Sequence, residues 1–244
     1  MSSPLRIAMW SGPRNISTAM MRAWENRGDC AVSDEPLYAA FLSDTQLDHP
    51  GRDEVIAAGE SDYKKVVSDL LGNAPGTREI WYQKHMTHHL LPHYERNWIP
   101  KLTNILLIRD PSEVVASYVK SRATVTPEDI GIPQQRKLHD EIIEATGTAA
   151  PIIDAGDFLR SPEKYLRALC KYLGIEFTNR MLHWPAGRRE SDGVWAPYWY
   201  AAVEASTGFE TWHTRDTALG GDAAHVVESC RADYDFLYQR RWII

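Results

Sequence analysis

The segment Ser11–Thr18, SGPRNIST, holds residues that can bind an anion. It follows the apolar run LRIAMW, turns at a Gly-Pro pair and enters a helical pattern. Consecutive backbone N–H groups at a helix start, together with the helix dipole, favour negative charge there. Arg14 adds a planar set of donors, and Ser17 and Thr18 add hydroxyls. A plain strand-to-helix turn with a Ser or Asn cap is the alternative interpretation.

The same loop lacks the Gly-Lys-Ser/Thr sequence that holds a nucleoside triphosphate and its Mg²⁺. The clearest strand-like run, TNILLI, ends in Arg109, and the following Asp110 is better explained as a helix cap than as a metal ligand. A sulfuryl group carries less charge than a phosphoryl group, so arginine, lysine and backbone amides can stabilise its transfer without a metal. The loop therefore favours a metal-free anion donor over ATP.

A second anion-binding pair lies in LLIRDPSEVVASYVKSR. Arg109 is expected at the carboxyl end of a buried strand, where ligands bind in open α/β sheets. Ser117 lies eight residues later, two turns along the predicted next helix. Together the two side chains can clamp an anion, although an Arg that caps carbonyls and a solvent-facing Ser would explain each residue taken alone.

Five strand-like runs alternate with helical patterns, which is typical of an α/β fold with a largely parallel sheet. The runs are LRIAMW, AVSDEP, EIWYQKH, TNILLIRD and APIIDAG. We predict a P-loop-like three-layer α/β/α architecture with a central, largely parallel sheet. Residues 1–244 are expected to form a single domain, with an α/β core at 5–180 and an aromatic-rich segment at 181–244.

Helix starts can be read at two X-Pro pairs, where Asp110 and Ser161 are predicted N-caps. Glu113 is expected in the first turn of the former helix. A final helix is predicted over residues 222–240.

Composition excludes some classes of partner. The chain has 27 Lys and Arg against 33 Asp and Glu, a net charge of −6, which argues against a general nucleic-acid surface. Its 3 cysteines form no CxxC pair, as is usual in a reducing compartment. There is no signal pattern at the N-terminus and no apolar run of membrane-spanning length. We expect a cytoplasmic protein with no nucleic-acid or membrane partner, and leave a homodimer open.

Together these features resemble the sulfotransferases that use 3′-phosphoadenosine-5′-phosphosulfate (PAPS), and most of all the compact bacterial members with DEP and KHM motifs. GPRNIST resembles the family's 5′-phosphosulfate loop, and DAGDFLRSPEKYLRALCKYLGIEF resembles its later strand, turn and helix, so the match covers about residues 5–180. The resemblance implies PAPS as the sulfuryl donor, a small-molecule acceptor and no metal. It implies these donor-binding residues: Arg14, Asn15, Ile16, Ser17 and Thr18 for the 5′-phosphosulfate, and Arg109 and Ser117 for the 3′-phosphate.

Two departures concern the adenosine half of the site. A tyrosine that often contacts the nucleotide is replaced by Ala155. The family's C-terminal Arg-Lys-Gly motif has only a weak substitute in Gly187-Arg188-Arg189.

The acceptor must lose a proton as it attacks sulfur, so a general base is required. HMTHHLLP resembles the family pattern HLPxxLLP, which makes His85 the first candidate, because imidazole titrates near neutrality. Glu35, in DEP, is the second, since protein-tyrosine sulfotransferases use a Glu at a similar place; Asp34 competes with it. Lys84 is a candidate to stabilise the leaving group, as is Arg14.

If KHMTHH were helical, its histidines would have zinc-binding spacing, but no HExxH pattern or partner carboxylate frames them. The later segment is rich in rings that can either wall an acceptor pocket or pack a layer over the sheet: Trp184, Trp195, Trp199 and Trp212.

The sequence therefore predicts a sulfotransferase that transfers a sulfuryl group from PAPS to a hydroxyl or amine of a small molecule. A P-loop nucleotide or metabolite kinase is one alternative, and a non-catalytic nucleotide-binding descendant of the sulfotransferase fold is another. The identity of the acceptor lies in variable loops that the sequence does not decode.

Overall fold

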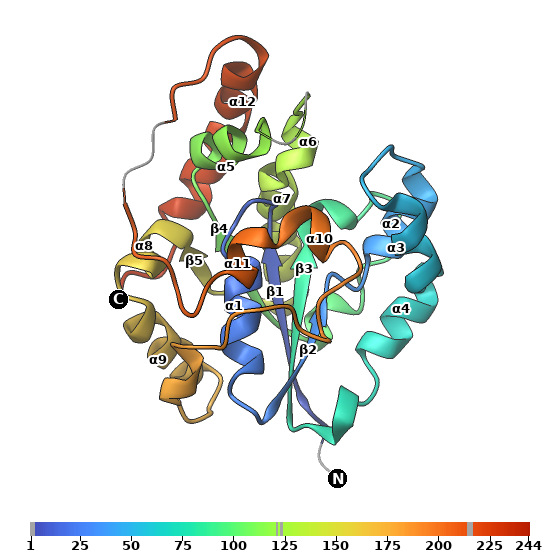
Figure 1. Cartoon of the computed structure of the whole chain (residues 1–244), viewed down its shortest axis with the longest axis vertical. Helices are drawn as coiled ribbons and strands as arrows, with labels where there is room; N and C mark the ends of the chain where they lie inside the picture. The colour runs from blue at the N-terminus through green and yellow to red at the C-terminus, as the bar shows by residue number, and fades with distance from the viewer. Residues whose placement is uncertain (1–2, 121, 123, 214–216) are drawn as a thin grey trace.

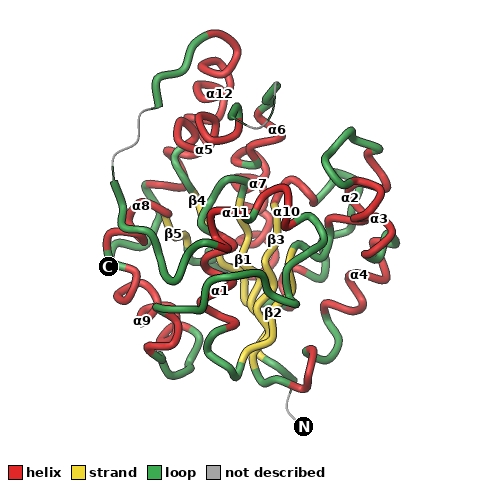
Figure 2. The backbone as a smooth tube through the Cα atoms, in the orientation of Figure 1, coloured by secondary structure: helices red, strands yellow, loops and turns green. Residues whose placement is uncertain are grey.

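Five parallel strands form the centre of the computed structural model, in the order β2-β3-β1-β4-β5 (Figures 1 and 2). The structure describes residues 3–120, 122, 124–213 and 217–244, so the rest of the predicted single domain lies outside the described residues. The strands are β1 (Leu5–Ser11), β2 (Cys30–Asp34), β3 (Ile80–Met86), β4 (Thr103–Ile108) and β5 (Ile152–Asp154). The prediction of an α/β fold with a parallel sheet is confirmed.

Helices cover both faces of this sheet. They are α1 (Ser17–Glu25), α2 (Tyr38–Thr45), α3 (Arg52–Ala58), α4 (Tyr63–Leu70), α5 (Pro111–Tyr118), α6 (Pro127–Ile130), α7 (Ile132–Thr146), α8 (Ala155–Arg160), α9 (Pro162–Tyr172), α10 (Ala196–Trp199), α11 (Ala201–Glu204) and α12 (Gly221–Tyr238). Short 3₁₀ turns are η1 (Pro75–Thr77), η2 (Thr87–His89), η3 (Ile99–Lys101) and η4 (Asn179–Met181).

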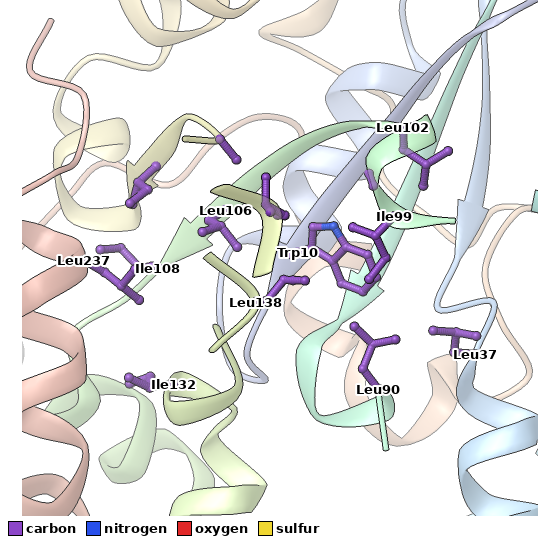
Figure 3. Packing of buried hydrophobic residues seen from close by; sticks show 14 of the residues in the cluster. Trp10, Leu37, Leu90, Ile99, Leu102, Leu106, Ile108, Ile132, Leu138 and Leu237 are labelled. Atoms are coloured by element: carbon purple, nitrogen blue, oxygen red, sulfur yellow. The ribbon is translucent and has the colours of Figure 1, made fainter. Parts of the chain in front are cut away.

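Alternation along the strands creates two separate cores, because successive side chains of a strand point to opposite faces. In β1, Trp10 belongs to the cluster shared with α4, α5, α7 and α12, and Met9 to the cluster shared with α1, α8 and α9. Figure 3 shows the first cluster, in which Leu138 and Leu237 pack with strand residues such as Ile108. All five of these side chains are fully buried. The three-layer arrangement follows from this two-sided burial.

The helix boundaries agree with the sequence except at their ends. The Asp110 carboxylate accepts a hydrogen bond from the Ser112 N–H and caps α5, as predicted. Ser161 precedes α9, but its side chain makes no capping hydrogen bond, so the predicted role of that hydroxyl is wrong. The predicted final helix, 222–240, is observed as α12, which begins one residue earlier and ends two residues earlier.

Parallel strands bring their carboxyl ends to one edge of the sheet, and the candidate site residues lie at or near those ends. In Figure 1 the segment with α10 and α11 crosses in front of β1 and β3 at this edge. Hydrogen bonds tie it there: the Gly193 N–H donates to Asp34 and the Tyr200 hydroxyl contacts Lys84. None of the helices in the described ranges is long and apolar enough to span a bilayer.

Candidate active site

A cavity of about 1020 Å³ opens at the carboxyl edge of the sheet. The residues predicted to bind the donor all line it: Arg14, Asn15, Ile16, Ser17, Thr18, Arg109 and Ser117. Two of the proposed catalytic residues, Glu35 and Lys84, line the same cavity, whereas His85 does not. The structure thus brings together two groups that lie far apart in the sequence.

The conformation of the loop after β1 leaves the backbone N–H groups in the first turn of α1 without a side-chain acceptor. The Asn15 side chain braces it, donating to the Leu107 carbonyl at 3.0 Å and accepting from the Ile16 N–H at 2.8 Å. Ile16 occupies the N-cap position of α1 and provides no side-chain cap. The first turn of α1 therefore presents its amides to the cavity without a competing side-chain acceptor, as an anion site requires.

Arg14 and Arg109 lie side by side. The Arg109 guanidinium donates to the Arg14 carbonyl at 2.7 Å, and Arg14 Nε donates to the Ser117 hydroxyl at 3.0 Å. Burial, followed by repulsion from Arg109, lowers the pKa of Arg14. Glu113, which the sequence suggested only as a helix-start acid, pairs with Arg109 at 2.8 Å. One carboxylate facing two guanidiniums leaves positive charge for an anion.

Lys84 lies on β3 with its ammonium fully buried among three oxygens. Its Nζ is 2.6 Å from Glu35 Oε1, 2.8 Å from Asp34 Oδ1 and 2.7 Å from the Tyr200 hydroxyl. Burial lowers the pKa of Lys84, but Asp34 and Glu35 outweigh it and hold that pKa well above its usual range. Burial raises the pKa of Glu35, Lys84 lowers it and Asp34 raises it, with a net upward shift.

Both Arg14 and Glu35 have a left-handed backbone, with φ of 53° and 44°. Non-glycine residues adopt this conformation at a cost of about 1–3 kcal/mol, and such residues gather at functional sites. In Glu35 it directs the chain away from β2 just where the carboxylate meets Lys84.

His85 is placed differently from the sequence expectation. The stretch that contains it is not helical: it is the end of β3 followed by the 3₁₀ turn η2. Strand alternation turns Lys84 and Met86 toward the cavity and His85 to the other face. There His85 is 1% exposed and stacks on Trp10 with ring centroids 4.3 Å apart.

The environment of His85 also suppresses its charge. Burial lowers its pKa to about 3, and among the described residues the only hydrogen-bonding contact of its imidazole ring is between Nε2 and Gln83 Oε1, at 3.2 Å. Within those residues no three His, Cys, Asp or Glu side chains are arranged to hold a metal ion.

Beyond Glu35 the cavity is walled by rings. His89 is sandwiched between Tyr38 and Phe41, with centroid distances of 4.6 and 4.7 Å. Burial lowers the pKa of His89 well below its usual range, and burial lowers that of His49 to about 4, so both are neutral at pH 7. The sequence predicted no ring wall here: His89 appears only as a residue of the HMTHHLLP and KHMTHH patterns, and Tyr38, Phe41 and His49 belong to no quoted motif.

Of the four tryptophans that could either wall an acceptor pocket or pack over the sheet, one lines the cavity and three do not. Trp199 lines the cavity, whereas Trp184, Trp195 and Trp212 do not. Trp184 packs edge-on against Phe209 at 5.0 Å, as a layer over the sheet would require.

At the opposite end, beyond the loop of Arg14, the cavity is lined by Leu159, Leu182 and residues 207–209. Ala155 is buried and does not line the cavity, and neither do Arg188 and Arg189.

Comparison with known proteins identifies the family. A sequence model of the sulfotransferase domain matches residues 5–223. Two Arabidopsis thaliana proteins named branched-chain-amino-acid aminotransferase-like protein 2 and 1 are 37% identical over 205 and 211 residues, 84% and 86% of this chain. The chain spans only 36% and 38% of those relatives.

Solved structures share the fold. The sulfotransferase domain from the curacin biosynthetic pathway superposes with a TM-score of 0.51 at 17% identity, covering 100% of both chains. A sulfotransferase from Alicyclobacillus acidocaldarius gives a TM-score of 0.55 at 11% identity, covering 100% of this chain and 98% of the other. With the family match over most of its length and the loop, sheet edge and cavity described above, the chain belongs to the sulfotransferase family.

Proposed function

We propose that the protein transfers a sulfuryl group from PAPS to a hydroxyl or amine of a small-molecule acceptor, with Glu35 as the general base. The observation that carries this proposal is that one cavity holds both an anion-binding helix start and a buried, lysine-paired carboxylate. The family match supports sulfuryl transfer, and the chain's resemblance to PAPS-dependent members supports the donor.

The donor would bind along the loop and α1. Arg14, the first-turn amides and the hydroxyls of Ser17 and Thr18 would hold the 5′-phosphosulfate. Arg109 and Ser117 are proposed for the 3′-phosphate, because they adjoin Arg14 yet belong to α5 and the end of β4.

The nucleoside would then extend along the Leu159 and Leu182 side, and the acceptor would occupy the opposite, ring-lined half. The Glu35 carboxylate lies in that half, together with Tyr38 and His89, so a base, a sulfuryl group and an acceptor can be arranged in line. Because the imidazoles there are neutral and the walls are rings, we propose that the acceptor is a small hydroxylated compound with an apolar body.

In the transfer, the acceptor oxygen attacks sulfur while Glu35 takes its proton. The bond between sulfur and the bridging oxygen breaks, and its electron pair stays on the phosphate of 3′,5′-diphosphoadenosine. Arg14 and the loop amides would stabilise that developing charge. Lys84 donates to three protein oxygens, so we assign it to hold Glu35 instead of the leaving group.

His85 is the less favoured base. A base must reach the acceptor, and His85 is packed on the far face of β3.

Calorimetry with 3′,5′-diphosphoadenosine, and separately with ATP plus Mg²⁺, tests donor binding. We expect the diphosphate to bind more tightly by at least about tenfold, since the proposal gives each of its phosphates a site. Tighter binding of ATP with Mg²⁺ would instead indicate a kinase, and binding of neither would indicate a repurposed scaffold. A screen of hydroxylated acceptors with ³⁵S-labelled PAPS then tests turnover.

A further inference from the structure

The lysine that holds the proposed base, Lys84, is itself held by Asp34 of the DEP motif and by Tyr200, which no motif marks. Asp34 ends β2, Lys84 lies beside it on β3, and Tyr200 joins α10 to α11, more than a hundred residues later. Asp34 Oδ1 accepts from Lys84 at 2.8 Å, and Asp34 Oδ2 accepts from the Tyr200 hydroxyl at 2.7 Å. This inference rests on the proposed function, because it concerns the environment of Glu35.

Counting donors and acceptors shows that the network is closed. An ammonium has three N–H groups, and those of Lys84 reach Asp34, Glu35 and Tyr200. The Tyr200 oxygen accepts from Lys84 and from Trp195 Nε1, at 2.7 and 3.1 Å, and its proton goes to Asp34. Within Glu35, Lys84 engages Oε1, so Oε2 is not committed to the ammonium.

The charges explain why a second carboxylate is needed. A lysine paired with Glu35 alone would favour the carboxylate strongly and weaken it as a base. Asp34 shares the ammonium and adds a like charge, which works in the opposite direction. Accordingly the pKa of Glu35 lies above its usual range, with burial as the largest cause and Asp34 also raising it.

The segment that carries Tyr200 is also held in place by contacts of its neighbouring residues. Asp192 forms an ion pair with Arg22 of α1 at 2.6 Å, and both side chains are fully buried. Next to it, the Gly193 N–H donates to Asp34 Oδ2 at 3.1 Å. The segment is thus fixed both to α1, which starts at the donor loop, and to the end of β2.

We propose that Asp34 and Tyr200 are positioning residues for sulfuryl transfer: they fix the Lys84 ammonium so that Glu35 presents a basic carboxylate to the acceptor. Tyr200 lines the cavity, whereas Asp34 lies behind it, so neither needs to touch the reacting atoms.

The test compares Asp34→Asn and Tyr200→Phe with the wild-type protein. Tyr198→Phe is the matched control, since Tyr198 lies on α10 two residues before Tyr200, is 45% exposed and does not line the cavity. Carbon-13 NMR of the Glu35 carboxyl gives its pKa directly, without turnover. The pH profile of kcat/KM with labelled PAPS gives the same group's effect on catalysis.

In Asp34→Asn we expect the pKa of Glu35 to fall by at least about one unit, because a like charge has been removed. The acid limb of kcat/KM should move to lower pH by the same amount, and kcat should fall at least about tenfold. Tyr200→Phe, which keeps the ring, should instead raise the pKa of Glu35, because the lost hydroxyl lowers that pKa, and it should also lower kcat. Tyr198→Phe should change neither quantity.

An unchanged pKa of Glu35 in both variants would overturn the inference, whatever the activity. If the wild-type protein shows no turnover with any acceptor, the proposed function fails, while the NMR titration still decides the role of Asp34 and Tyr200. Should Asp34→Asn not fold, Tyr200→Phe alone decides the matter, since it removes a single hydroxyl.

Discussion

Replacement of His85 by phenylalanine tests most directly which residue can serve as a base. His85 is 1% exposed and burial lowers its pKa to about 3, whereas an unfolded histidine titrates near 6.5. Below pH 6.5 the unfolded chain takes up a proton that the folded chain does not. The contribution of His85 to the free energy of unfolding is therefore fully present above pH 6.5 and is lost as the pH falls toward about 3.

The magnitude follows from this difference. When the pH falls from 7.5 to 5.5, protonation of unfolded His85 should lower the free energy of unfolding by about 1.4 kcal/mol. This is the free energy that corresponds to the one pH unit between the unfolded pKa and pH 5.5. His85→Phe keeps a flat ring on Trp10 but cannot titrate. The variant should thus lose about 1.4 kcal/mol less than the wild-type protein over this range, even though its stability at pH 7.5 is lower because Gln83 loses a partner.

Urea unfolding followed by tryptophan fluorescence at the two pH values measures the effect. The difference between proteins is the informative quantity, because the raised pKa of Glu35 acts with the opposite sign in both. His225→Gln, at an exposed position of α12, is the control and should show the wild-type loss. An equal loss in His85→Phe and in wild type would mean that folded His85 titrates near neutrality, and the argument from its lowered pKa would fail.

Three further outcomes are expected. Glu35→Gln should lower kcat by about 10²–10⁴-fold, with binding of 3′,5′-diphosphoadenosine unchanged by calorimetry, since only the base is removed; full turnover would refute the assignment. Arg109→Ala should weaken 3′,5′-diphosphoadenosine by at least about tenfold but leave adenosine 5′-phosphate unaffected, because the proposed partner is the 3′-phosphate; equal loss for both ligands would place Arg109 elsewhere. Asp192→Ala should destabilise the fold by about 3–5 kcal/mol in urea unfolding, since it leaves the buried Arg22 with only the more distant Glu25, at 3.9 Å; a change below about 1 kcal/mol would contradict a structural role for this ion pair.

The grouping of the residues proposed for the donor could be predicted because its signals are local, and the structure places them around one cavity. A loop between a strand and a helix fixes where Arg14 and Ser17 lie relative to the amides, and Arg109 and Ser117 are placed by one strand end and one helix. The five strands were likewise visible as apolar runs, since a parallel sheet buries both faces of each strand.

The catalytic half depends on relations that a single segment does not carry. As long as HMTHH could be helical, the sequence did not determine which way the His85 side chain points. The alternation of side chains along β3 shows that His85 and Lys84 lie on opposite faces of the sheet. Tyr200 meets Lys84 through a turn between two four-residue helices, with no periodic pattern to reveal it. Glu113 was seen as a helix-start acid, because its partner Arg109 becomes evident only once α5 is placed.

The left-handed backbone at Arg14 and Glu35 also sets a limit on engineering. On backbone grounds alone, glycine at either position would relieve about 1–2 kcal/mol of strain. A library sorted only for resistance to heat would therefore be drawn toward glycine at Arg14, whereas at Glu35 the loss of a close partner of the buried Lys84 opposes that change. Thermostable versions of this protein are better sought with both residues held fixed, and selection by survival of the fold should be paired with selection for ligand binding.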